Sequence, residues 1–196
     1  MTLNYFPLPG RAEATRVALA YAGKEFKDNK LGFAEYGAGK WAGKGLPVLE
    51  MDGAEYTQST ALLRYAGKLG GLYPEDALTA LKVDEIVMIV EDILASLFKC
   101  MSDKDGSIAK DLLKGKLKTL LEVLTAKVQA SSSKFSVGDS LTIADLQIHS
   151  VIANVKAGFL PTIPATLIED TAAPLMDVDA AVMEDPKVKA YYAPTA

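Results

Sequence analysis

The chain has 196 residues, of which 49% are apolar and 23% are charged, and this is the composition of a folded globular protein. With 25 acidic and 21 basic residues the net charge is -4, and no run of lysine or arginine is long enough to follow a phosphate backbone, so we expect no nucleic-acid partner. The one cysteine, Cys100, and the one histidine, His149, exclude an intrachain disulfide, a His/Cys metal cluster and any Ser-His-Asp triad that does not use His149. We therefore expect no metal.

The sequence also lacks the patterns of secretion and membrane insertion. The N-terminus shows neither the basic nor the apolar segment of a secretory signal. Apolar runs such as residues 87–90 are far shorter than the roughly 18 residues that a membrane-spanning helix needs. We therefore expect a cytoplasmic protein with no membrane partner.

The first part of the chain alternates between strand and helix patterns. Residues 3–6 predict a short strand, residues 12–22 predict a helix that ends at Gly23, and residues 25–31 predict a second strand. Two strands that are joined through a helix run parallel to each other. This segment therefore predicts a βαβ unit.

A hairpin and a helix follow this unit. Residues 47–51 and 54–57 flank an Asp-Gly pair, which is the strongest short-range signal for a two-residue turn between strands. Residues 59–69 predict a helix, and the glycine-rich stretch 32–43 leaves room for one more short helix. The predicted order is therefore βαβ followed by ββα.

A Gly/Pro-rich stretch at residues 70–76 then separates this pattern from a long helical one. We place the domain boundary there, with one domain at residues 1–71 and a second at residues 77–196. In the second domain, apolar residues recur at helical spacing over residues 83–101 and 117–128. These two segments predict long amphipathic helices.

A third helix of the second domain begins with a capping signal. The Thr142 hydroxyl can accept from the free amides of the first turn, and the Asp145 carboxylate can reach back to the backbone of Thr142, as in a capping box. Later prolines divide the remaining chain into short helices. The predicted fold is thus an α/β domain followed by an all-α bundle.

This domain order and several local motifs resemble the cytosolic glutathione S-transferase family, in particular its tyrosine-type, sigma-like members. The matching segments extend over nearly the whole chain: YFPLPGRAE at 5–13, LPVL at 46–49, QSTALLRY at 58–65, VED at 90–92, GDSLTIAD at 138–145 and DPKVKAY at 185–191. The resemblance implies a thioredoxin-like domain that binds glutathione and a helical domain that binds the second substrate.

The resemblance also implies a chemistry, in which glutathione is held as a thiolate, the competent nucleophile. Tyr5 is the candidate activator, because a phenolic hydrogen bond stabilises the charged sulfur. Arg11 would place a positive charge near the sulfur. The alternatives are that Tyr5 is an aromatic residue of the core and that Arg11 forms a surface ion pair. No serine or cysteine lies between Phe6 and Arg11, so serine-type and cysteine-type transferases lack their functional residue here.

Backbone and side-chain groups are expected to bind the rest of glutathione. Leu46 precedes Pro47 and is held extended, so its backbone can pair with the cysteinyl unit, and the resemblance implies that Pro47 is cis. Gln58 and Ser59 lie where a strand meets a helix, where helix-start amides and the Ser59 hydroxyl can bind the γ-glutamyl carboxylate. A capping role for Ser59 is compatible with this.

Asp92 lies in the first long helix among apolar neighbours, where a carboxylate needs a cation. The resemblance implies a homodimer in which Asp92 binds the γ-glutamyl ammonium of the partner subunit's glutathione. A locally solvated carboxylate is the alternative.

The stretch upstream of Leu46 departs from the family pattern, which has a tryptophan and a lysine there. Tyr36 with Lys40 preserves the spacing of that pair, whereas Trp41 with Lys44 preserves the tryptophan. Either lysine can meet the glycyl carboxylate of glutathione, and the sequence leaves both possibilities open.

Apolar residues are candidates for the pocket of a hydrophobic substrate. Leu8, Phe98 and Met101 are suitable walls, although helical spacing also places such residues in a core. Cys100 is interpreted as a small buried hydrophobe and His149 as a structural residue.

The leading functional prediction is a dimeric, cytoplasmic transferase of alkyl or aryl groups that conjugates glutathione to hydrophobic electrophiles in detoxification. A glutathione-dependent isomerase of prostaglandin-synthase type is an alternative on the same fold. A ligandin-like or crystallin-like carrier without catalysis is the second alternative, because the 32–45 stretch departs from the pattern.

Overall fold

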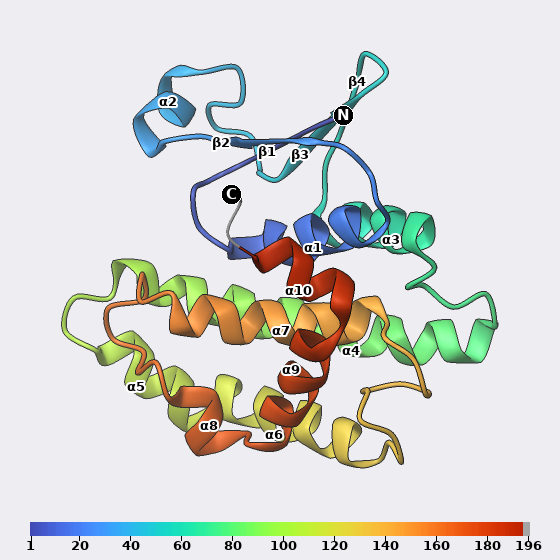
Figure 1. Cartoon of the computed structure of the whole chain (residues 1–196). Coiled ribbons are helices and arrows are strands. Elements are labelled where there is room, and N and C mark those ends of the chain that lie inside the picture. Colours follow the sequence, from blue (N-terminus) through green and yellow to red (C-terminus); the bar gives the residue numbers. More distant parts are fainter. Residues whose placement is uncertain (194–196) are drawn as a thin grey trace.

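A computed structural model describes residues 1–193 of the chain (Figure 1). The N-terminal part is a four-stranded mixed sheet in the order β2-β1-β3-β4. β1 runs parallel to β2 and antiparallel to β3, and β3 runs antiparallel to β4. The strands are β1 (Thr2–Tyr5), β2 (Lys27–Lys30), β3 (Val48–Met51) and β4 (Ala54–Tyr56).

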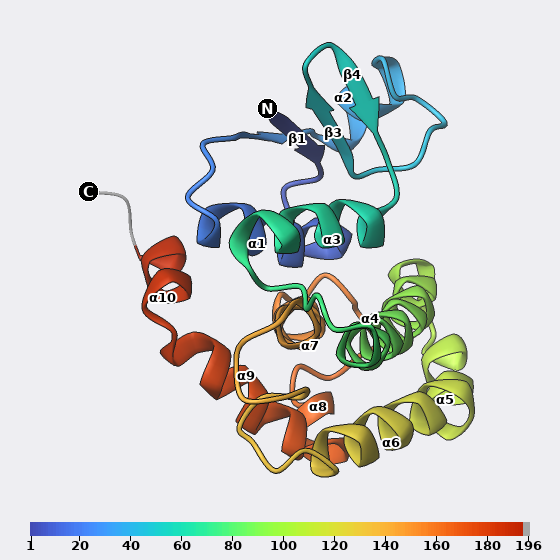
Figure 2. The ribbon, with the colours of Figure 1, turned by 90° about the vertical axis from the view of Figure 1, so that its right-hand side faces the viewer.

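Two helices pack between this sheet and the rest of the chain. α1 (Glu13–Tyr21) and α3 (Ser59–Gly70) lie side by side beneath the sheet, and a 3-10 turn, η1 (Gly10–Ala12), leads into α1 (Figure 2). The short α2 (Phe33–Ala38) lies beyond the sheet, away from the helical part (Figure 1). The expected βαβ-ββα order and the additional short helix are therefore present.

The hairpin between β3 and β4 forms as the Asp-Gly pair predicts. Asp52 and Gly53 have φ angles of 52° and 79°. Two consecutive positive φ angles match the right-handed twist of the flanking strands, and glycine and aspartate tolerate them better than most residues. The turn therefore fixes the register in which Leu49 pairs with Tyr56.

β2 is shorter and more polar than the sequence pattern suggested. Its four residues, KDNK, pair only with β1 at the edge of the sheet. Backbone hydrogen bonds to β1 rather than an apolar face hold it there, and the buried Asn4 side chain adds a link by accepting from the Asn29 amide at 2.7 Å.

The second part of the chain is helical. Its elements are α4 (Ala77–Phe98), η2 (Lys99–Ser102), α5 (Ser107–Lys114), α6 (Lys116–Gln129), α7 (Ile143–Lys156), α8 (Leu167–Thr171), α9 (Pro174–Glu184) and α10 (Pro186–Tyr192). α7 runs through the centre and packs against α4, α9 and α1 (Figure 2). Nearly all of its residues are buried, so it links the helical part to the sheet domain.

The predicted start of α7 is present in full. Thr142 is the N-cap residue, and its hydroxyl accepts from the Ala144 amide at 3.2 Å. Asp145 accepts from the backbone and the hydroxyl of both Thr142 and Ser136, at distances of 2.7–3.0 Å. Burial outweighs these hydrogen bonds and raises the pKa of Asp145. The capping box therefore also fastens the preceding loop to the helix.

Among residues 1–193, no helix combines the length and the apolar character needed to cross a bilayer.

Candidate functional site

A cavity of about 350 Å³ lies where the sheet domain meets α4. It brings together the ends of several elements: η1, the loop before β3, the end of β4 and the start of α3. Its lining consists of Arg11, Trp41, Lys44, Gly45, Leu46, Pro47, Val48, Glu55, Thr57, Gln58, Ser59 and Glu91. Most of the residues that the sequence predicts to bind glutathione therefore line this one cavity.

The backbone at this cavity has two unusual features. The Leu46–Pro47 peptide bond is cis. Gln58, which precedes α3, has φ 73° and ψ 103°, a conformation that non-glycine residues rarely adopt and that is found mostly at functional positions. Gln58 rather than Ser59 is the N-cap residue, so the Ser59 hydroxyl is not used as a cap. The free amides of the 12-residue helix α3 start at the cavity wall, where they favour an anion.

Tyr5 lies at the end of β1, and its side chain is buried, with 5% of its surface exposed. Its hydroxyl accepts a hydrogen bond from the Arg11 amide at 2.9 Å. Burial raises the pKa of Tyr5, so the hydroxyl keeps its hydrogen at neutral pH. Gly10 has φ 52°, and a Cβ there would lie 2.3 Å from the Tyr5 hydroxyl oxygen, so only glycine lets the turn pass this close.

Arg11 faces the cavity in an ion pair with Glu91 of α4. Its guanidinium also lies over the Phe98 ring, 5.2 Å from the centroid. The second oxygen of Glu91, Oε2, is buried and has no hydrogen-bond partner among the described residues. The sequence did not single out Glu91 as a site residue. The acidic pair at 91–92 pointed to this part of the helix, but Asp92 was chosen from it.

Asp92, which the sequence nominated instead, points away from this cavity. Its side chain is 60% exposed, and its carboxylate lies 3.9 Å from Lys116 Nζ. Neighbouring residues of a helix point in directions about 100° apart, so only one of the two acids can face the cavity of its own chain. A role for Asp92 therefore requires a second subunit.

The structure distinguishes the two candidate lysines. Lys40 forms ion pairs with Glu50, at 2.7 Å, and with Glu55, and these hydrogen bonds raise its pKa. Lys44 lines the cavity, and so does Trp41, whose indole Nε1 has no partner in the part of the chain described. Tyr36 donates to the Lys44 carbonyl and supports the loop.

The three residues nominated for the hydrophobic substrate do not share one cavity within residues 1–193. Phe98 lies beside Arg11 and 6.3 Å from the ring of Phe159. Leu8 lines a separate cavity of about 250 Å³, and Met101 lies at the surface.

Two further nominated residues occupy structural positions. Cys100 is fully buried, and burial raises the pKa of its thiol. His149 contacts Asp179 and Tyr192 rather than the cavity. In residues 1–193, His, Cys, Asp and Glu side chains form no group of three that could hold a metal ion.

Asn154 of α7 supports the turn that carries Arg11. Its side-chain oxygen accepts from the Gly10 amide at 2.8 Å, and its amide donates to the Gly10 carbonyl at 3.1 Å. Sequence reasoning missed Asn154, because its partner is 144 residues away in the chain.

This architecture defines the class of the protein: a thioredoxin-like sheet domain with a cis-proline turn, joined to a helical domain, with a cavity at the junction. Residues 1–68 match the family profile "Glutathione S-transferase, N-terminal domain", and residues 90–195 match "Glutathione S-transferase, C-terminal domain". The chain therefore belongs to the glutathione S-transferase family, as the motifs predicted, and is an enzyme of the transferase class that uses glutathione as co-substrate.

Curated relatives agree with this assignment. Glutathione S-transferase 3 of Caenorhabditis elegans is 33% identical over 156 residues, which are 74% of this chain and 75% of the relative. S-crystallin 4 of Enteroctopus dofleini is 29% identical over 172 residues, which are 78% and 80% of the two chains.

Solved structures share the fold over nearly the full length. The glutathione S-transferase of Ascaris lumbricoides has a TM-score of 0.79 at 28% identity and covers 100% of this chain and 98% of its own. A monomeric glutathione S-transferase of the hookworm Necator americanus has a TM-score of 0.77 at 25% identity, with coverage of 99% and 98%. Prostaglandin synthase D of Nilaparvata lugens has a TM-score of 0.83 at 22% identity, with coverage of 100% and 98%.

Proposed function

We propose that this transferase uses Tyr5 to hold glutathione as a thiolate and conjugates it to hydrophobic electrophiles in cytoplasmic detoxification. The observation that carries this proposal is the hydrogen bond from the Arg11 amide to the Tyr5 oxygen. Because the Tyr5 oxygen accepts there, its own hydrogen is left to donate, and no acceptor within residues 1–193 takes it. A thiolate at the cavity edge beside Arg11 would be that acceptor.

One such hydrogen bond is sufficient to hold a substantial share of the glutathione thiol as thiolate at neutral pH. A free thiol has a pKa of about 8.5, so only a small fraction is ionised at neutral pH. A hydrogen bond to a charged group contributes about 1.5–3 kcal/mol, which lowers the thiol pKa by about one to two units. No general base is needed, which suits a chain whose one histidine lies elsewhere.

The cavity offers a complementary group for each part of glutathione. Lys44 suits the glycyl carboxylate, with Trp41 beside it in the cavity wall, and the backbone of Leu46 suits the extended cysteinyl unit. Gln58 and Ser59, at the start of α3, suit the γ-glutamyl carboxylate.

The direct test of thiolate formation is an ultraviolet titration of glutathione bound to the wild-type protein. A thiol pKa well below the free value, together with turnover of a generic aryl halide, supports the transferase proposal. Hydrophobic-dye binding without a shift of the thiol pKa and without turnover would contradict it. That outcome would support a carrier without catalysis, an alternative that agrees with the similarity to S-crystallin 4.

The two lysines provide a matched pair of variants. Lys44→Ala is expected to raise the KM for glutathione about tenfold, because a charged hydrogen bond to the glycyl carboxylate is lost. Lys40→Ala is expected to leave this KM within about twofold, because Lys40 is held by Glu50 and Glu55. Steady-state kinetics at varied glutathione concentrations measures both KM values. A raised KM in Lys40→Ala with an unchanged KM in Lys44→Ala would instead assign the glycyl carboxylate to Lys40.

We also propose that α4 forms the centre of a homodimer and that Asp92 acts on the partner subunit's glutathione. Leu78, Leu81 and Met88 are large apolar residues exposed on α4, and at helical spacing they share one face with Asp92. Such a face favours association with a second copy.

Light scattering coupled to gel filtration tests the dimer. The wild-type protein is expected to have twice the mass of one 20.9 kDa chain. Leu81→Glu is expected to lower the mass to that of one chain, because the new carboxylate would be buried at the interface. Lys114→Glu, a charge change on another helix, is the control. A wild-type monomer, the state described for the Necator americanus structure, would contradict both the dimer and the role of Asp92.

A further inference from the structure

A buried arginine holds the loop between Tyr5 and Arg11. Arg16 of α1 is 3% exposed, and its guanidinium donates to the carbonyls of Leu8 at 2.9 Å, Pro9 at 3.2 Å and Phe6 at 3.2 Å. The same guanidinium lies 5.6 Å from the centre of the Tyr5 ring. The position of Arg16 therefore determines the path of the loop that follows the Tyr5 strand.

Arg16 is in turn connected to the C-terminal helix through Glu13. One oxygen of the buried Glu13 carboxylate lies 3.4 Å from Arg16 Nη1, and the other accepts from the Tyr192 hydroxyl at 2.7 Å. Burial, together with the Glu13 carboxylate, raises the pKa of Tyr192 far above its usual range. Tyr192 therefore keeps its hydrogen and donates it to Glu13.

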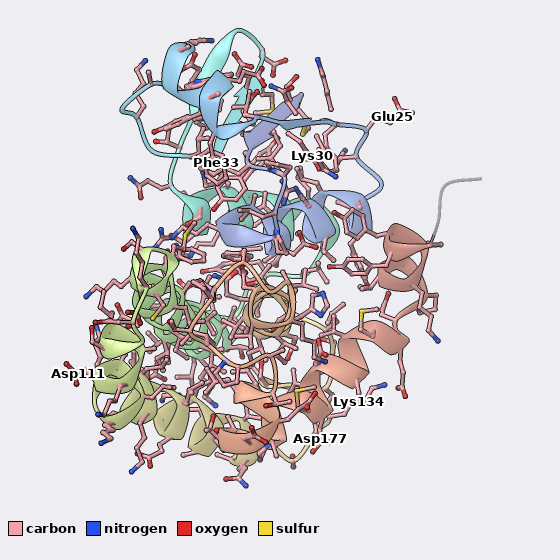
Figure 3. The ribbon with its side chains drawn as sticks, turned by 90° about the vertical axis from the view of Figure 1, so that its left-hand side faces the viewer. Glu25, Lys30, Phe33, Asp111, Lys134 and Asp177 are labelled. Atoms are coloured by element: carbon pink, nitrogen blue, oxygen red, sulfur yellow. The ribbon has the colours of Figure 1, made fainter. Side chains whose placement is uncertain are left out.

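This series of hydrogen-bonded side chains continues into the helical domain. His149 Nε2 lies 2.8 Å from the Tyr192 oxygen, and His149 Nδ1 lies 2.6 Å from an oxygen of Asp179 on α9. α9 and α10, at the C-terminal end of the described chain, pack along the side of α7 and α1 (Figure 3). The hydrogen-bonded side chains therefore join four helices, since each of them lies on a different one.

Two further groups pack around these side chains. Asp28 of β2 accepts from Arg16 Nε at 3.0 Å, and the Tyr191 ring packs against the Tyr192 ring with centroids 4.7 Å apart. Burial and Glu13 raise the pKa of Tyr191 as well, so it stays neutral.

We propose that the series of hydrogen-bonded side chains Asp179–His149–Tyr192–Glu13 positions Arg16 and, through it, the loop between Tyr5 and Arg11. The effect on catalysis rests on the proposed role of Tyr5, whereas the effect on stability does not. His149 and Tyr192 are then positioning residues of the transferase, and they also hold α10 against α1 and α7.

Thermal melting measures the contribution of His149 to stability. The wild-type protein is expected to melt about 3–6 °C above His149→Gln, because glutamine does not make both contacts of the imidazole ring.

Thermal melting of the full-length protein and its Tyr192→Phe variant provides the second arm. Tyr192→Phe removes the hydroxyl that joins His149 to Glu13 and is expected to lower the melting temperature by about as much as His149→Gln. Melting temperatures of both variants equal to that of the wild type would overturn the proposal.

Kinetics separate positioning from a purely structural role. At pH 6.5, both variants are expected to lower kcat about threefold to tenfold and to leave the KM for glutathione within about twofold, because the residues proposed to bind the two carboxylates of glutathione, Lys44, Gln58 and Ser59, lie outside the loop between Tyr5 and Arg11. An unchanged kcat would overturn the positioning role. If wild-type protein fails to lower the thiol pKa of glutathione, the role of Tyr5 fails, and the melting experiment still decides whether these hydrogen bonds hold α10 in place.

Discussion

Replacing Tyr5 by phenylalanine is expected to raise the thiol pKa of bound glutathione by about one to two units and to lower kcat at pH 6.5 by about ten- to a hundredfold. The substitution removes the hydroxyl that the Arg11 amide orients and leaves the ring in its buried position. The thiolate then loses a charged hydrogen bond, and the ionised fraction falls accordingly. The fold is expected to persist, because only one oxygen atom is removed from a core side chain.

The pH dependence of this effect identifies its cause. In alkaline solution glutathione is ionised without help, so the rates of the wild-type protein and of Tyr5→Phe are expected to converge near pH 9. Difference absorbance of the thiolate and the pH profile of kcat measure this. Tyr21→Phe, at the far end of α1, is the control and should match the wild type. Equal thiol pKa values in all three proteins would contradict the role of Tyr5.

Local signals in the sequence were sufficient for much of the fold. The Asp-Gly pair predicted the β3–β4 hairpin because its backbone conformation depends on the two turn residues themselves. Thr142 and Asp145 predicted the start of α7 because a capping box closes within four residues. The polar strand β2 was placed only approximately, because the pairing with β1, rather than its own side chains, makes it a strand.

The site was predictable where its groups come from the backbone path of a motif, as at Leu46 and Gln58. It was not predictable where a side chain depends on distant partners. Glu91 faces the cavity and Asp92 does not, and this depends on how α4 is rotated against Arg11. Likewise, Lys40 is held by ion pairs with Glu50 of β3 and Glu55 of β4, and no local sequence pattern marks these pairs.

The contacts that hold the site residues in place were the hardest part to predict from the sequence. Asn154 reaches Gly10 across 144 positions of the chain, and Tyr192 reaches Glu13 across 179. Each is a common polar residue on a helix with no local pattern to mark it. Such contacts appear only when α7 and α10 are docked on α1.

Asp145→Ala is expected to lower the free energy of unfolding by about 3–5 kcal/mol. The carboxylate is fully buried and accepts four hydrogen bonds, two from Thr142 and two from Ser136. Alanine leaves the two buried backbone amides without acceptors, and each such loss costs about 1–3 kcal/mol. Urea denaturation followed by circular dichroism measures the change.

The size of this effect depends on where Asp145 acts. α7 packs against α4, α9 and α1, so a weakened α7 start affects both the helical core and the Asn154 contact to the Gly10 turn. Asp139→Ala, an exposed acid in the same loop, is the control and is expected to change stability by less than about 0.5 kcal/mol. If the two variants unfold at the same urea concentration, the four hydrogen bonds contribute no net stability. If Asp145→Ala alone is destabilised, the capping box that fastens the loop to α7 is a principal support of the junction that carries the site.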